Sequence, residues 1–115
     1  MMSARVSDAS DDVQRGEQIY DRCLACHALE RNRTGPKHCG LFGRRAGSVP
    51  GFEYSKAMRR SGIVWNEATL DAFLAHPMRA VPGTTMGYAG IESPQERSDL
   101  IAYLRSASAS AAHCR

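Results

Sequence analysis

The stretch from Gly35 to Gly62 constrains the fold of this chain more than any other feature. It holds six of the ten glycines, together with Pro36 and Pro50. This density of glycine and proline predicts turns and loops, with one short helix between a cap at Ser55 and a terminator at Gly62. Irregular chain of this length buries little apolar surface against itself and is uncommon inside a small domain. We therefore expect a large, flat, apolar prosthetic group to fill the centre of the molecule.

The rest of the chain is predicted to form short helices around a single core, because 115 residues with 43% hydrophobic content are about the size of one domain. A first helix is expected after a cap at Asp11 or Asp12, a second between Asn66 and Pro77, and a last one at the Ser-Pro-Gln-Glu sequence of residues 93–96. No segment alternates as a strand does, which indicates an all-α fold with three to five short helices. The expected buried positions are Val13, Gly16, Ile19, Tyr20 and Cys23, then Leu70, Phe73 and Leu74, and finally Leu100, Ile101, Tyr103 and Leu104.

The expected organisation is a flexible N-terminal segment at residues 1–11, a domain at 12–106 and a frayed Ser/Ala-rich tail at 107–115. No apolar run approaches the roughly 20 residues that cross a bilayer, and the first residues lack the hydrophobic core of an export signal. We therefore expect a soluble chain without membrane insertion.

The charge is balanced overall but unevenly distributed. Fifteen Lys and Arg oppose 12 Asp and Glu, which argues against a dedicated nucleic-acid binder. Residues 31–60 hold eight Lys or Arg and one Glu, so the basic charge is concentrated there. This stretch is either a solvated basic face or a docking surface for an acidic partner.

Residues 23–27 read Cys-Leu-Ala-Cys-His, the attachment sequence for c-type haem. On a helical turn, thiols three residues apart lie on one side and reach the vinyl groups along one haem edge, while His27 places an imidazole beneath the iron. A thioredoxin-like dithiol uses the same letters but follows a strand, where a helix is predicted here. A zinc site formed by Cys23, Cys26, His38 and Cys39 is a further alternative, although adjacent ligands are awkward for tetrahedral closure and zinc would leave the loops without a core.

A haem iron has a sixth position, and Met86 is the best-placed candidate for it. This methionine lies in Val-Pro-Gly-Thr-Thr-Met-Gly-Tyr, residues 81–88, an extended segment that can lie flat over a ring face while a flexible thioether points inward. A lone methionine more commonly packs in the hydrophobic core than binds a metal. The other candidates are Met58, Met78, His38, His76 and His113.

The motifs CLACH, TGP, GLFGRRAG, PGFEYSKAM, GIVW, TLDAFL, VPGTTM, YAGI and DLIAYL occur in the order and spacing of class I cytochromes c. From Val13 to Ser106 the chain resembles the branch that holds mitochondrial cytochrome c and bacterial cytochrome c2. The resemblance implies one covalently attached haem c held by thioethers from Cys23 and Cys26. His27 and Met86 are the implied iron ligands.

The resemblance also implies the surroundings of the haem. The carbonyl of Pro36 would accept a hydrogen bond from the His27 ring and fix its orientation. The residues at positions that bond the haem propionates are Arg44, Tyr54 and Trp65.

Three residues depart from the family pattern near the haem. Phe73 stands where mitochondrial members have a tyrosine near the distal sulfur, and Met58 replaces a buried asparagine, so a drier distal pocket is expected. His38 replaces a leucine on the proximal side, where a packed neutral histidine is expected in preference to a ligand.

In the family, the first and last helices cross, and Gly16 lies where such a crossing near Tyr103 needs a small residue. The turn after Pro36 lies close to the end of the last helix in the family. This proximity implies a disulfide between Cys39 and Cys114, the alternative being two unpaired thiols.

The function implied is that of a monomeric one-electron carrier and not of an enzyme, in the periplasm of a bacterium, with its export signal absent from the chain as given. The alternative is a haem peroxidase or a gas or redox sensor with a displaceable Met86. Expected partners are a cytochrome bc1-type complex, a terminal oxidase, a reaction centre or a periplasmic dehydrogenase. Family members that bind oxidases carry lysines around the haem edge, whereas the matching positions here hold Met78, Arg79 and Thr85.

Overall fold

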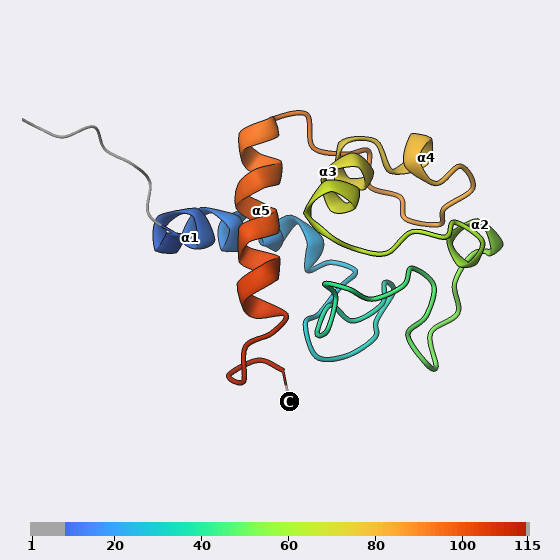
Figure 1. Ribbon diagram of the computed structural model, residues 1–115, viewed down its shortest axis with the longest axis horizontal. Helices are drawn as coiled ribbons and strands as arrows, with labels where there is room; N and C mark the ends of the chain where they lie inside the picture. The colour runs from blue at the N-terminus through green and yellow to red at the C-terminus, as the bar shows by residue number, and fades with distance from the viewer. Residues whose placement is uncertain (1–8, 115) are drawn as a thin grey trace, which may run out of the picture.

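Five α-helices and one 3-10 helix form the regular structure of residues 9–114, the part of the chain that the computed structural model describes (Figure 1). In that part no strand occurs, and the only β-type pairing is an isolated antiparallel bridge between Arg45 and Val64. The predicted all-α class is therefore confirmed. The elements are α1 (Ala9–Tyr20), η1 (Asp21–Cys23), α2 (Lys56–Arg59), α3 (Glu67–Ala75), α4 (Pro77–Ala80) and α5 (Pro94–Ala107).

The first and last helices cross at close range, and Figure 1 shows α5 running across α1. Gly16 is buried at the crossing. A Cβ atom at this position would lie 2.6 Å from Cβ of Tyr103 and 2.7 Å from the carbonyl carbon of Asp99. No side chain fits in that space, so the helices meet there only because residue 16 is glycine.

Asp99 adds a buried polar contact to the same crossing. It is 3% exposed, and its carboxylate accepts hydrogen bonds from Arg15 Nε at 3.0 Å and from Gln95 Nε2 at 2.9 Å. A buried carboxylate is tolerated where it is paired and hydrogen-bonded. The pair joins residues 84 positions apart in the chain and so fixes how α1 lies on α5.

Side-chain caps begin three of the helices where the sequence predicted them. Ser55 Oγ accepts a hydrogen bond from the Met58 N–H at 3.0 Å, and Ser93 Oγ does the same for the Glu96 N–H at 3.1 Å. Asn66 forms a reciprocal capping box with Thr69. These caps satisfy backbone N–H groups that have no partner within a helix.

The predicted limits of two helices were wrong, and a further short helix was not predicted. Helix α1 is already formed at Ala9, so Asp11 and Asp12 lie in its first turn rather than at its cap. Helix α2 ends at Arg59, before the predicted stop at Gly62. Pro77 does follow the end of α3, but it also begins α4, because a proline at the first helical position gives up an N–H that would be unpaired anyway.

The core lies between α1, α3 and α5 and includes every residue predicted to be buried on α3 and α5. Phe73 packs edge to face on Trp65 with ring centroids 5.3 Å apart. The residues buried on these two helices are Leu70, Phe73, Leu74, Asp99, Leu100, Ile101, Tyr103, Leu104 and Ala107.

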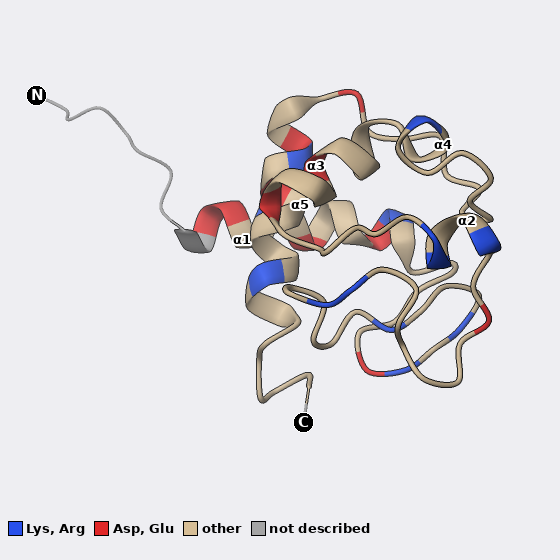
Figure 2. Ribbon diagram, turned by 45° about the vertical axis from the view of Figure 1, so that its right-hand side comes forward, with Lys and Arg blue, Asp and Glu red and all other residues tan. Residues whose placement is uncertain are grey.

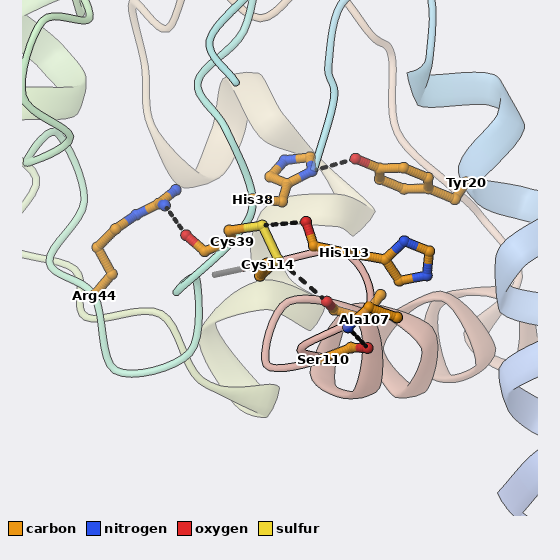
Figure 3. The surroundings of a disulfide bond; sticks show 9 residues. Tyr20, His38, Cys39, Arg44, Ala107, Ser110, His113 and Cys114 are labelled. Carbon is orange, nitrogen blue, oxygen red and sulfur yellow. Dashed lines mark hydrogen bonds between the residues drawn. A yellow bond between two sulfur atoms is a disulfide. The ribbon is translucent and has the colours of Figure 1, made fainter. Parts of the chain in front are cut away.

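The tail after α5 packs against the body, which corrects the expectation that it frays from residue 106. Ser108 is 4% exposed, and its carbonyl accepts a hydrogen bond from the Gly40 N–H at 3.0 Å. Beyond it, Cys114 lies next to Cys39, with their Cα atoms 5.6 Å apart (Figure 3). Residues 1–8 and 115, which the sequence analysis assigned to a flexible segment and to the end of the tail, lie outside the described residues.

Replacing Gly16 with alanine should destabilise the protein by about 3 kcal/mol, because the added methyl group forces α1 away from α5. Guanidinium unfolding of the haem-containing protein measures this. The control is Gln14→Ala on the exposed side of α1, where alanine should be neutral or favourable for helix formation. Equal stability of the two variants would contradict the close helix crossing.

Candidate functional site

A cavity of about 480 Å³ lies inside the loops and is closed on one side by α3 and α5. Its wall includes apolar side chains from both helices, and its volume is typical of sites that enclose a small organic molecule. All of the residues that the sequence analysis assigned to the site contribute to this wall: Cys23, Cys26, His27, Pro36, Arg44, Tyr54, Trp65 and Met86.

The Cys23–His27 segment forms a helical turn at the cavity wall. The Cys26 N–H bonds the Cys23 carbonyl at 3.1 Å, and the His27 N–H bonds the same oxygen at 2.8 Å. Both thiols line the cavity, and neither is in a disulfide. Burial raises the pKa of the Cys23 thiol to about 11, so at neutral pH this thiol is protonated, which disfavours dithiol exchange.

The imidazole of His27 is held so that one nitrogen remains available. Its Nδ1 lies 2.9 Å from the Pro36 carbonyl oxygen, the hydrogen bond that the resemblance implies. Because a carbonyl only accepts, Nδ1 carries the proton, and burial lowers the pKa of His27 and keeps the ring neutral. The lone pair is therefore on Nε2, which is the form of histidine that ligates a metal.

Gly35 packs its backbone against the same ring. A Cβ atom on Gly35 would meet Cε1, Nε2 and Nδ1 of His27 together, with 2.6 Å to Nδ1. Such simultaneous approach to three ring atoms places it over the face of the imidazole. The Gly-Pro pair of residues 35–36 thus contacts both the face and the Nδ1 edge of the His27 ring.

Arg44, Tyr54 and Trp65 give the cavity a polar part. Arg44 is partly buried, and its Nη1 donates to the Cys39 carbonyl at 3.3 Å. Burial lowers the pKa of this guanidinium, although an arginine remains charged in proteins. The Tyr54 hydroxyl accepts from the Val49 N–H at 3.1 Å, which leaves its own proton to donate. A cation and O–H and N–H donors at one place suit a ligand with carboxylates.

The structure narrows the candidates for the sixth ligand. Met78 is 59% exposed, and neither His76 nor His113 lines the cavity. Met58, Met86 and His38 do line it.

His38 is stacked on the His27 ring and so lies on the His27 side of the cavity. The thioethers of Met58 and Met86 remain. Met86 lies in irregular chain outside the helices, where its N–H donates to Oγ1 of the buried Thr84 at 3.3 Å.

Two features near the site were missed from the sequence. Arg22, beside Cys23, forms a two-pronged pair with Glu96 of α5 at 3.1 and 3.0 Å and joins the attachment turn to the last helix. Tyr20 bonds His38, and Tyr20 and His38 lie 18 positions apart in the chain. Both are long-range pairings, for which no local sequence signal exists.

Within residues 9–114, no group of three or more His, Cys, Asp or Glu is arranged to hold a metal ion. The zinc alternative therefore has no support.

None of the described helices is long and apolar enough to cross a bilayer.

Two thiols on one turn, an adjacent imidazole with an available Nε2 and a thioether lining the same cavity are the features of a c-type haem protein. The family model of cytochrome c matches residues 13–108. The chain is 44% identical over 99 residues to cytochrome c2 of Rhodomicrobium vannielii, an alignment that covers 84% of this chain and 79% of that protein. It is 42% identical over 112 residues to cytochrome c of Chlamydomonas reinhardtii, which covers 94% of this chain and all of the relative.

The solved structure of cytochrome cH from Methylobacterium extorquens matches with a TM-score of 0.80 and 41% identity, covering 82% of this chain and 97% of that one. The chain belongs to the cytochrome c family of electron carriers. Its cofactor is therefore haem c, a covalently attached iron porphyrin, and the cavity, thiols and imidazole fit that group.

Replacing Gly35 with alanine should displace the His27 ring or the loop beside it, because the added methyl group overlaps the imidazole. We expect a loss of about 2 kcal/mol of stability, seen as a lower melting temperature of the ferric protein. The exposed neighbour provides the control, Thr34→Ala. An unchanged melting temperature in Gly35→Ala would contradict this packing.

Proposed function

We propose that the protein is a one-electron carrier in which His27 and Met86 ligate the haem iron. The observation that carries the proposal is the hydrogen bond of His27 Nδ1 to Pro36, which directs an unprotonated Nε2 to the metal while Met86 lines the same cavity. The bound iron supplies the ferrous–ferric couple, and His/Met ligation raises its potential. The chain's part is to hold both ligands in place during the transfer.

The remaining cavity residues have defined roles under this proposal. Cys23 and Cys26 form the thioethers, which fix the porphyrin edge to the attachment turn. Arg44 together with the donors of Tyr54 and Trp65 bonds the propionates and offsets the cost of burying their charge. The apolar wall from α3 and α5 excludes water from the rest of the porphyrin.

The distal side should be drier than in mitochondrial members of the family. Phe73 is 6% exposed and has no hydroxyl to hold a water, and Met58 also lines the cavity. Few polar groups are then left to reorient when the iron changes charge. This supports electron transfer rather than substrate turnover as the activity.

We further propose a bacterial periplasmic location and protein partners. The cytochrome c2 and cytochrome cH relatives support this, and the expected partners are a cytochrome bc1-type complex, a terminal oxidase, a reaction centre or a periplasmic dehydrogenase. Figure 2 shows most of the basic residues on the loops and α2, and acidic residues gathered on the helices. The monomer would use this charge separation to orient itself on a partner.

The Cys39–Cys114 disulfide is proposed as a covalent tie in the mature protein. The geometry of the two residues supports it, because their Cα separation of 5.6 Å is normal for a bridge. The bond closes a loop with a sequence separation of 75, for which the chain-entropy model gives a stabilisation of about 4 kcal/mol. It also agrees with an oxidising compartment.

The far-red absorption of the ferric protein tests the ligation. A Met-to-iron charge-transfer band should be present in the natural protein and in Met58→Leu, and absent from Met86→Leu. The two variants are matched, since both remove a thioether from the same cavity. Loss of the band in Met58→Leu alone would show that Met58, and not Met86, is the ligand. A high-spin spectrum of the natural protein would favour a peroxidase or a sensor.

Thiol counting tests the disulfide. The denatured, unreduced haem protein should contain no free thiol, because two cysteines are in thioethers and two in the bridge. After reduction two thiols should appear, and the melting temperature should fall. Two free thiols before reduction would contradict the bridge.

A further inference from the structure

We propose that His38 is a positioning residue for the iron ligand: it connects the crossing of α1 and α5, through Tyr20, to the imidazole of His27 and sets the orientation of that ring. The inference rests on the proposed role of His27 as a ligand. It assigns His38 and Tyr20 a part in setting the electronic properties of the haem.

The contact between the two histidines is a ring stack. Their ring centroids are 4.2 Å apart and their planes differ by only 20°, so the two rings are nearly parallel. A stacked partner resists tilting of the ring against which it lies. The Pro36 carbonyl holds the Nδ1 atom of His27, and Gly35 lies against a face of the ring, but the hydrogen bond by itself permits rotation about its own axis. The stack restrains the rotation that the hydrogen bond permits.

His38 is itself fixed from two sides. Its Nδ1 lies 2.8 Å from the Tyr20 hydroxyl (Figure 3), and its backbone N–H bonds the carbonyls of Ala28 at 3.3 Å and Leu29 at 3.1 Å. These hydrogen bonds hold the His38 ring in place beside His27.

Tyr20 brings the helix crossing into contact with this stack. It is 3% exposed, near the end of α1, and its ring lies 5.2 Å from that of Tyr103 on α5. Its ring also meets His38 edge to face, with centroids 5.6 Å apart. A series of aromatic contacts and one hydrogen bond thus connects the crossing of α1 and α5 to the ring of His27.

The orientation of an axial imidazole matters because groups around a ligand tune the metal through it. In the ferric state, the plane of the imidazole influences how the unpaired electron is distributed over the porphyrin. Nuclear magnetic resonance reports this distribution as the pattern of shifted haem methyl signals. A residue that merely stabilises the fold would leave that pattern unchanged.

The experiment uses the mature ferric protein and compares Tyr20→Phe, His38→Leu and the double variant with the natural protein. Tyr20→Phe keeps the aromatic packing and removes only the bond to His38. Tyr103→Phe is the matched control, since it removes a hydroxyl from the same aromatic group without touching His38. Reduction potentials are measured on the same samples.

We expect Tyr20→Phe and His38→Leu to change the spacing of the haem methyl signals and to shift the potential. The double variant should equal His38→Leu, because Tyr20 acts only through His38, and Tyr103→Phe should match the natural protein. If Tyr20→Phe behaves as Tyr103→Phe does, the inference is overturned while the ligation stands. If the natural protein lacks signals from a coordinated imidazole, the proposed ligation fails and the inference with it.

Discussion

The structure depends on an apolar centre that the polypeptide does not fill by itself. The loops between the attachment turn and α3 provide few buried side chains of their own, and they surround a cavity of about 480 Å³. Haem c supplies the missing apolar surface, which removes the conflict between the length of these loops and the small size of the domain. The cofactor is thus part of the core as well as the seat of the chemistry.

The crossing of α1 and α5 has a second role besides closing the domain. Gly16 allows α1 to approach α5, and the buried Asp99 with Arg15 fixes how they lie. From this helix crossing, Tyr20 extends to the loop that follows the attachment turn and bonds His38 there. The contact between α1 and α5 therefore lies one aromatic side chain away from His38, which stacks on His27.

Local signals in the sequence were sufficient for most helix caps and for the attachment motif, whereas a family resemblance was needed for the other cavity residues. Ser55, Asn66 and Ser93 cap helices as predicted because a cap is decided within four residues. The first-turn position of Asp11 was missed because an acidic side chain suits both the cap and the first turn of a helix. The packed tail at Ser108 was missed because its docking depends on residues far away in the chain. The pairing of Tyr20 with His38 could not be predicted either, because the residues around one of them do not indicate that it contacts the other. The roles assigned to the cavity residues remain predictions.

Helix α5 also bears on how the holoprotein is made. Leu100 and Leu104 of this helix belong to the cavity wall, whereas Cys23 and Cys26 come early in the chain. The compartment for the porphyrin is therefore incomplete until the C-terminal part arrives and docks on α1. Docking of α5 on α1 therefore completes the wall of the cavity on that side.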